Sequence, residues 1–334
     1  MNKEIEKMPK VVLHLHLDGS LRPETVAEWL GEEVEEVKQK LMVDKDCRDL
    51  NEYLEKFDLP GKVLQTKENI ERTTYELFED LSKQNVIYAE VRFAPSKHLA
   101  GGLSYGEVVE AAIQGMNRAK GEFGIDGNLI LCCMRGDNNK EENLKTVKVA
   151  KEYLGKGVCA LDLAGAEALF KTENFEDIFK LARENNIPFT IHAGEADGPK
   201  SIKKALEFGA KRIGHGVRCI EDKDLMGRLA QEGIALEVCP ISNLQTQAIQ
   251  GKHPIEELYR KGISVTVNTD NNTVSNTDIF AEYEWILENT NLTTDDLINM
   301  NLNAARKIFA DSQRKVQLVQ KINEYKNMEK NKEK

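Results

Sequence analysis

The sequence predicts an α/β protein built as a single (β/α)8 TIM barrel, with a helical insertion after the first strand and extra helices at the C-terminus. Three observations carry this prediction. Eight short runs rich in Val, Ile and Leu follow one another along the chain, and each precedes a helical pattern. No Gly-x-Gly-x-x-Gly turn follows any strand, which disfavours the alternative of an open, doubly wound sheet. Eight alternating strand–helix units with parallel strands close into a barrel.

The composition is that of a cytoplasmic globular protein with a full hydrophobic core. The chain has 334 residues, enough for one large barrel, and a net charge of −10 with no basic stripe, which excludes nucleic acid as a partner. No apolar run is long enough to span a membrane, and the start MNKEIEKMPK lacks the apolar segment of a signal peptide. Six cysteines without a C-x-x-C pattern indicate free thiols in a reducing compartment. No obligate protein partner is evident.

The first strand lies within Val11–Ser20, VVLHLHLDGS. Alternate side chains of a strand share a face, so His14 and His16 point the same way and the intervening leucines point the other way. Two imidazoles at the end of a buried strand suit a metal ion. This spacing alone is equally compatible with structural or surface histidines, so the decision depends on the rest of the chain.

Residues 21–85 form an unusually long connection between the first two strands. Pro23 suits a first helical turn, and short helices are expected over Pro23–Val43 and Leu50–Phe57. A longer periodic helix is expected over Lys67–Gln84. Long insertions often act as active-site lids, so we expect this segment to cover a site on the barrel.

Seven further strand–helix units follow in a regular rhythm. The expected strands are Val86–Pro95, Asn128–Gly136, Val158–Gly165, Pro188–Ala196, Arg212–Gly216, Ile234–Asn243 and Ile263–Asn271. The expected helices are Tyr105–Phe123, Glu141–Leu154, Phe175–Asn185, Pro199–Phe208, Lys223–Glu232, Pro254–Lys261 and Asp278–Asn289. Residues 292–334 are expected to be additional helices, with a frayed, solvated end rich in lysine and glutamate. With no linker or repeat, residues 1–334 are expected to form one domain.

The ends of the predicted strands carry the residue types of a metal site. In barrels of this class the chemistry lies at the C-terminal ends of the strands. Four of the six histidines fall there, whereas His98 and His253 lie in loops. Three imidazoles and one carboxylate describe a catalytic zinc site with an open position, and the residues that fit are His14, His16, His192 and Asp270. For each histidine taken singly, a buried side chain without a metal remains the alternative.

Several longer motifs extend this pattern. HLHLDGS, LDLAGAE, IHAGE, RIGHGVR, CPISN and VTVNTDN occur in this order, one per strand end, between about Pro9 and Phe309. In these motifs the chain resembles the adenosine deaminases of the metal-dependent amidohydrolase superfamily. The resemblance implies zinc-dependent hydrolysis of adenosine or 2′-deoxyadenosine to inosine or 2′-deoxyinosine plus ammonia, in purine metabolism and salvage.

The resemblance also implies the role of each site residue. One zinc ion per chain is expected, with the ligands His14, His16, His192 and Asp270. The catalytic pair would be Glu195, which protonates purine N1, and His215, which assists the water held by the metal. The implied substrate contacts are His16, Asp18, Leu54, Phe57, Gly165 and Asn271.

The resemblance also implies which part of the nucleoside these residues would contact. The backbone N–H of Gly165 would meet purine N3, and Asp18 would bind a ribose hydroxyl. Leu54 and Phe57 would cover the base from the lid. Burial beneath that lid should raise the pKa of Glu195, so that it carries a proton at neutral pH. The simpler alternative for Glu195 is an acid favoured at a helix N-terminus.

The chain departs from the family pattern at strand eight. Two consecutive aspartates and a proline are usual there, whereas this chain has Asp270-Asn271-Asn272. The resemblance implies that the second residue of this motif, here Asn271, forms a hydrogen bond with purine N7. Because N7 is only an acceptor and the amide NH2 of Asn271 donates at any pH, the change is compatible with function. At strand four, Asp162 is present but the bridging lysine of binuclear relatives is absent, which favours a single metal ion.

Three rival functions remain at this stage. The chain could deaminate free adenine or a modified nucleoside, although Asp18 favours a ribosyl hydroxyl and disfavours a 5′-phosphate; nearby Arg22 weakens that argument. A binuclear phosphotriesterase-like or amide hydrolase is disfavoured by the missing lysine. A silent zinc-binding protein would have no need of Glu195 and His215. The preference between ribose and deoxyribose, the oligomeric state and regulation stay open, and His/Asp ligands leave the metal's identity partly to supply.

Overall fold

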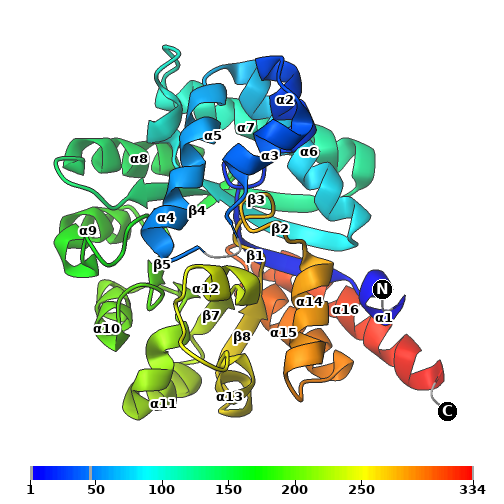
Figure 1. Cartoon of the computed structure of the whole chain (residues 1–334). Coiled ribbons are helices and arrows are strands. Elements are labelled where there is room, and N and C mark those ends of the chain that lie inside the picture. Colours follow the sequence, from blue (N-terminus) through cyan, green and yellow to red (C-terminus); the bar gives the residue numbers. More distant parts are fainter. Residues whose placement is uncertain (1–2, 45–46, 333–334) are drawn as a thin grey trace.

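The eight strands form a closed parallel barrel. A computed structural model describes residues 3–44 and 47–332 of the chain. Its strands pair in two four-stranded sheets, in the orders β1-β2-β3-β4 and β5-β6-β7-β8. Single bridges between Leu161 and Phe189 and between Leu15 and Asp270 join the sheets at both seams. The strands lie at the centre of the molecule with helices around them (Figure 1). The (β/α)8 barrel is therefore confirmed.

The strands agree with the predicted ones in order and position, but three of them are much shorter than expected. Their bounds are β1 Lys10–His16, β2 Val86–Phe93, β3 Asp126–Met134, β4 Val158–Ala164, β5 Thr190–Ala193, β6 Arg212–His215, β7 Ala235–Val238 and β8 Ser264–Val267. Every residue of β1 and β4 is buried, as expected for strands covered on both faces. The expected strands Pro188–Ala196, Ile234–Asn243 and Ile263–Asn271 were too long, since β5, β7 and β8 have four residues each. In the second case Pro240 begins the helix α12 (Pro240–Gln245).

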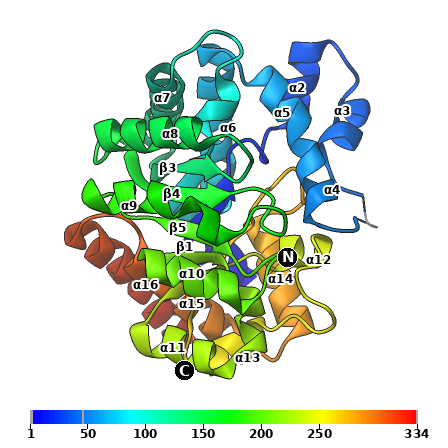
Figure 2. The ribbon, with the colours of Figure 1, turned by 90° about the vertical axis from the view of Figure 1, so that its left-hand side faces the viewer.

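The long connection after β1 is helical, as predicted. It contains α2 Pro23–Leu30, α3 Val34–Leu41, α4 Leu50–Leu54, the 3-10 turn η1 Glu55–Phe57, α5 Asp58–Val63 and α6 Lys67–Lys83. Figure 2 shows α2 to α5 beyond one end of the strands, whereas α16 lies towards the other side. The helix α5 was not predicted, and residues 45 and 46 lie outside the described part of the chain. The role of this segment as a lid stays a prediction.

The remaining helices surround the barrel. They are α1 Lys3–Lys7, α7 Tyr105–Phe123, α8 Lys140–Tyr153, α9 Glu176–Glu184, α10 Pro199–Phe208, α11 Lys223–Glu232, α13 Ile255–Arg260, α14 Ile279–Asn289, α15 Thr294–Lys307 and α16 Ser312–Lys332, with 3-10 turns η2 Pro95–His98, η3 Thr172–Phe175 and η4 Val217–Glu221. Local signals explain their limits. The 19-residue helix α7 begins with a capping box between Ser104 and Glu107 and ends at Gly124 in the left-handed conformation.

The C-terminal helix α16 is more than a solvated extension. Leu318, Ile322 and Tyr325 are buried, and their spacing places them on one face of the helix. The hydroxyl of Tyr325 also donates a hydrogen bond to the carbonyl oxygen of Glu4 (2.8 Å). The helix α16 is thus packed as far as Tyr325, and residues 333 and 334 lie outside the described part. Within the described residues, no helix combines the length and apolarity needed to cross a membrane.

Candidate active site

The predicted metal ligands meet at the C-terminal ends of the strands. His14, His192, His215 and Asp270 are all buried and each offers a ligand atom within 4.8 Å of the others. His16 joins them, because its Nε2 lies 3.1 Å from Nε2 of His192 and 3.4 Å from Oδ1 of Asp270. The structure therefore brings together all four residues predicted as ligands and adds His215 to the same cluster.

The backbone of this cluster is held in uncommon conformations. His215 and Asp270 have φ values of 58° and 61°, in the left-handed region that costs a non-glycine residue about 1–3 kcal/mol. Asp270 is fixed by its neighbours on β1, since its N–H donates to the carbonyl oxygen of His14 (3.1 Å) and its carbonyl accepts from the N–H of His16 (2.7 Å). Gly214 makes room for the rings, because a Cβ there would lie 3.2 Å from Cε1 of His14.

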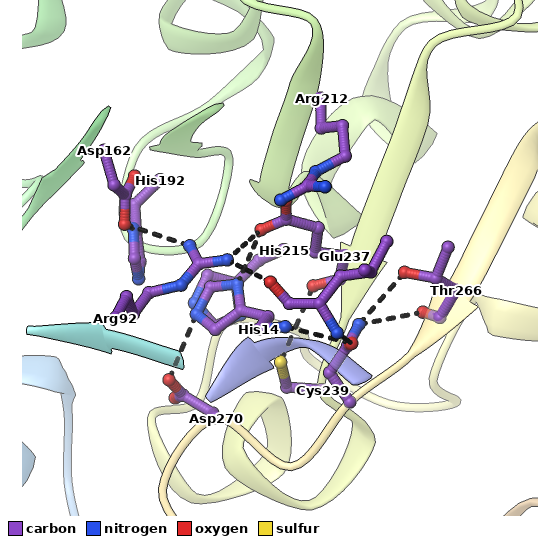
Figure 3. A network of polar contacts seen from close by, with 12 residues as sticks. His14, Arg92, Asp162, His192, Arg212, His215, Glu237, Cys239, Thr266 and Asp270 are labelled. Carbon is purple, nitrogen blue, oxygen red and sulfur yellow. Dashed lines mark hydrogen bonds and ion pairs between the residues drawn. The ribbon is translucent and has the colours of Figure 1, made fainter. Parts of the chain in front are cut away.

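Two buried carboxylates orient the histidine rings from below. Nδ1 of His14 lies 3.0 Å from Oε2 of Glu237, and Nδ1 of His192 lies 2.8 Å from Oδ2 of Asp162. A hydrogen on each Nδ1 leaves the lone pair of Nε2 for a metal, which is how carboxylate–histidine pairs act in metal centres. Arg92 lies between the two carboxylates, donating from Nη1 to Asp162 (2.9 Å) and from Nη2 to Glu237 (2.8 Å) (Figure 3).

The electrostatics keep the carboxylates charged. Burial opposes the ionisation of Asp162, but His192 and Arg92 hold its pKa well below the usual range. Burial opposes the ionisation of Glu237 as well, but Arg92 and Arg212 hold the pKa of this carboxyl well below its usual range.

Burial acts in the opposite sense on the imidazoles. It lowers the pKa of His16, His192 and His215, so these rings are neutral. Neutral imidazoles beside ionised carboxylates are the protonation states that metal binding needs.

The donor set fits a divalent ion. Nε2 of His14 is buried, lies 3.2 Å from Oδ1 of Asp270, and has no hydrogen-bond partner among the residues that the structure describes. The other oxygen of Asp270 accepts a hydrogen bond from the hydroxyl of Ser242 (2.6 Å), which fixes the carboxylate. Imidazole nitrogens with one carboxylate are the ligands typical of catalytic zinc and of similar borderline metals.

The two predicted catalytic residues adjoin this cluster. Oε2 of Glu195 lies 3.4 Å from Nε2 of His215, and its Oε1 accepts a hydrogen bond from the hydroxyl of Thr246 (3.0 Å). Nδ1 of His215 lies 2.9 Å from Nδ2 of Asn243. Burial, followed by the negative charge of Asp270, raises the pKa of Glu195 well above its usual value, which confirms the expected direction.

A cavity of about 520 Å³ lies over the cluster. All six predicted substrate contacts line it: His16, Asp18, Leu54, Phe57, Gly165 and Asn271. Its volume is in the range of pockets that enclose small ligands. The helix α4 is tied to the loop after β8 by a hydrogen bond between the hydroxyls of Tyr53 and Ser275 (2.6 Å).

Sequence reasoning missed several residues of this cavity. His98, assigned to a loop, is buried in η2 with its Nε2 4.0 Å from Oδ2 of Asp18. Lys97 precedes it, and Cys132 and Arg135 line the wall from the end of β3. The position of Lys97 and His98 in the sequence could have indicated them, because the turn after β2 lies on the same face of the barrel as the other strand ends.

The Asp18 carboxyl has one oxygen, Oδ1, without a hydrogen-bond partner among the described residues. That oxygen is buried, and burial raises the pKa of Asp18 to about 7. The Asp18 side chain lies on the cavity wall and is 14% exposed.

Comparisons with known proteins agree with this arrangement. A family model described as adenosine deaminase matches residues 9–325. An adenosine deaminase of Haemophilus ducreyi is 42% identical over 93% of this chain and 94% of its own length. The crystal structure of an adenine deaminase from Arthrobacter aurescens superposes with a TM-score of 0.86 at 27% identity, covering 96% of this chain and 99% of that one. An Arabidopsis N6-mAMP deaminase gives 0.86 at 29% identity, with 97% and 100% covered.

Proposed function

The chain belongs to the adenosine deaminase family, and we propose that it hydrolyses adenosine and 2′-deoxyadenosine to inosine and 2′-deoxyinosine plus ammonia. One observation carries the proposal beyond family membership. The buried cluster of histidines and Asp270 forms the floor of a cavity whose wall holds Glu195, a carboxyl that burial keeps protonated. A metal site beside a proton donor is what hydrolysis of an aromatic amine requires.

We propose one zinc ion per chain, held by His14, His16, His192 and Asp270. When bound, zinc supplies a water molecule that is a nucleophile at neutral pH. The state of Asp162 supports a single ion, because its Oδ2 is engaged by Arg92 and its Oδ1 accepts from the N–H of Leu163 (2.7 Å). Both oxygens of this carboxylate are thus already engaged within the protein, and the bridging lysine of binuclear relatives is absent from strand β4.

Glu195 acts as the acid. Its carboxyl faces the cavity in the protonated form and donates to N1 of the purine, which makes C6 electrophilic as the water adds there. The hydroxyl of Thr246 holds the other end of the carboxyl in place. His215 receives a hydrogen bond at Nδ1 from the amide of Asn243, so its Nε2 carries the hydrogen and orients the attacking water.

The rest of the cavity selects a nucleoside. Asp18, whose side chain lines the cavity wall, accepts from a ribose hydroxyl, and Gly165, with φ at 105°, presents its backbone N–H to purine N3. Oδ1 of Asn271 packs against Gly19, where a Cβ would lie only 1.7 Å from it, so the amide NH2 is left for purine N7. Leu54 and Phe57 cover the base and keep bulk water out.

The domain organisation and the compartment are part of the same proposal. Residues 1–334 form one barrel domain, in which the insertion 21–85 covers the site and residues 292–334 add the C-terminal helices. All six cysteines are buried free thiols, and the reducing cytoplasm keeps thiols in that state.

Assays with four purines test the activity. Purified protein is incubated with adenosine, 2′-deoxyadenosine, adenine and AMP while ultraviolet absorbance and released ammonia are followed. We expect turnover of both nucleosides and none of adenine or AMP. No spectral change with any of the four would refute the deaminase function. Faster turnover of adenine or AMP than of the two nucleosides would refute the proposed substrates and assign that purine instead.

Two variants test the role of Glu195. Glu195→Gln should bind zinc as the wild type does and lose at least about 10²-fold in kcat, because the amide has no acidic proton to transfer to purine N1. The control is Glu184→Gln, an exposed glutamate on α9, which should leave kcat unchanged. Unaltered turnover of Glu195→Gln would remove this residue from the mechanism.

A further inference from the structure

Glu167 is a buried carboxylate with no part in the chemistry described so far. It lies just after β4 and its side chain is 1% exposed. Its two oxygens accept hydrogen bonds from four consecutive backbone N–H groups, those of residues 194–197, at 2.7, 3.0, 2.7 and 3.1 Å. The hydroxyl of Ser201 donates a fifth (2.6 Å). Residues 194–197 include Glu195.

The shape of this loop explains why one carboxylate can collect so many donors. Gly194 has a φ of 75°, and a Cβ there would lie 2.4 Å from Cδ1 of Ile202, so only glycine allows the turn. Successive N–H groups after such a turn point to one side and form a concavity for an anion. Glu167 fills this concavity, and without it four backbone N–H groups, two of them buried and two partly buried, would lose their partner.

The carboxylate is itself anchored to the barrel. Ser201 shares a hydrogen bond with the hydroxyl of Thr172 (2.7 Å), which also accepts from Nη2 of Arg135 (2.9 Å). The same Nη2 donates to the carbonyl oxygen of His192 (2.7 Å). Residues after three strands thus connect Glu167 to the backbone of a predicted metal ligand, and the loop has little freedom to move relative to the metal site.

We propose that Glu167 is a positioning residue for the proton donor, holding the 194–197 loop so that the carboxyl of Glu195 stays beside His215 and above the metal ligands. The inference rests on the proposed function, in which Glu195 protonates the substrate. The tolerance for movement is small, because a displacement of about 1 Å lowers an enzymatic rate by about 10²-fold.

Substitution of Glu167 by glutamine tests the inference. The amide keeps the size of the side chain but turns an NH2 group towards backbone donors, so the loop loses part of its anchor. We expect kcat per active site to fall by about 10²-fold, while KM for adenosine changes by less than about 3-fold, because the cavity wall is otherwise unchanged. Glu167→Asp keeps the charge and should recover part of kcat. Glu173→Gln is the matched control, because this glutamate also follows β4 but is exposed and pairs with Lys200 at the surface (2.9 Å), so it should leave kcat unchanged.

A double-mutant cycle with Glu195→Gln separates positioning from general stability. If Glu167 acts through Glu195, adding Glu167→Gln to the Glu195→Gln variant causes no further loss of kcat, whereas a structural role makes the losses add. Thermal melting and zinc content accompany each variant, and Glu167→Asp carries the cycle if Glu167→Gln does not fold. Additive losses, or a kcat of the single variant within about 3-fold of wild type, would overturn the inference. Wild-type turnover by Glu195→Gln would instead overturn the proposed acid.

Discussion

Replacing Arg92 by methionine removes the cation that joins the two carboxylates beneath the metal site. Methionine has a similar length and no charge, so the change deletes donors without opening a large cavity. Three hydrogen bonds disappear, to Asp162 (2.9 Å), to Glu237 (2.8 Å) and to the carbonyl oxygen of Leu13 (2.5 Å). In this variant the buried carboxylates of Asp162 and Glu237 lose the positive charge of Arg92, which offsets part of the cost of burying them.

The magnitude follows from what the carboxylates retain. Breaking a buried ion pair on one side costs about 3–5 kcal/mol. Glu237 keeps a hydrogen bond from Nε of Arg212 (2.6 Å), and Asp162 keeps its contact with His192 (2.8 Å). We expect the lower end, a loss of about 3 kcal/mol in the free energy of unfolding. Because both carboxylates orient predicted ligands, metal affinity should also fall by about 10–100-fold.

Urea unfolding of the metal-free protein and competition with a zinc chelator measure the two effects separately. The matched control is Arg118→Met, because Arg118 is 48% exposed and forms a surface ion pair with Glu71 (3.2 Å). Exposed pairs contribute little, so this variant should lose far less stability. A loss under about 1 kcal/mol for Arg92→Met, together with unchanged zinc affinity, would refute the reasoning.

Three further predictions concern pH, the metal and the lid. Burial raises the pKa of Glu282 to about 8, so between about pH 4.5 and 8 the folded state holds a proton that the unfolded state has lost. Stability from this group should fall as pH rises through that window, and Glu282→Gln should flatten the dependence; parallel melting curves from pH 5 to 9 would contradict it. Chelation should abolish turnover and lower the melting temperature, and about one equivalent of zinc per chain should restore both; a need for two would argue against a single ion. Phe57→Ala should raise KM for adenosine about 10-fold with little change in melting temperature, because the ring lies half-buried at the cavity wall; Phe123→Ala on α7 is the control, and equal KM values in both variants would remove Phe57 from substrate binding.

The sequence by itself determined the barrel and the location of the site. Strand and helix periods are local, so all eight strands and most helices could be read in order, and eight alternating units leave one closed architecture. The rule that barrel chemistry lies at strand ends then turned positions in the sequence into neighbours in space. His14, His192 and Asp270 meet within 4.8 Å for this reason, although they come from three strands.

Only the tertiary structure decided what lies around and beneath these residues. Arg92 and Glu237 are 145 positions apart, and Glu167 is 28 positions from the Glu195 N–H that it binds. No local pattern marks such pairs, since a buried arginine and an exposed one look alike in a sequence. Their meeting depends on the register of parallel strands and on closure of the barrel, which set the distance between side chains to within a hydrogen bond. The spacing of His14 and His16 in the first strand, taken with the residues at the other strand ends, thus predicts two metal ligands from the sequence alone. The charged residues that hold these ligands in place are brought to them only by closure of the barrel.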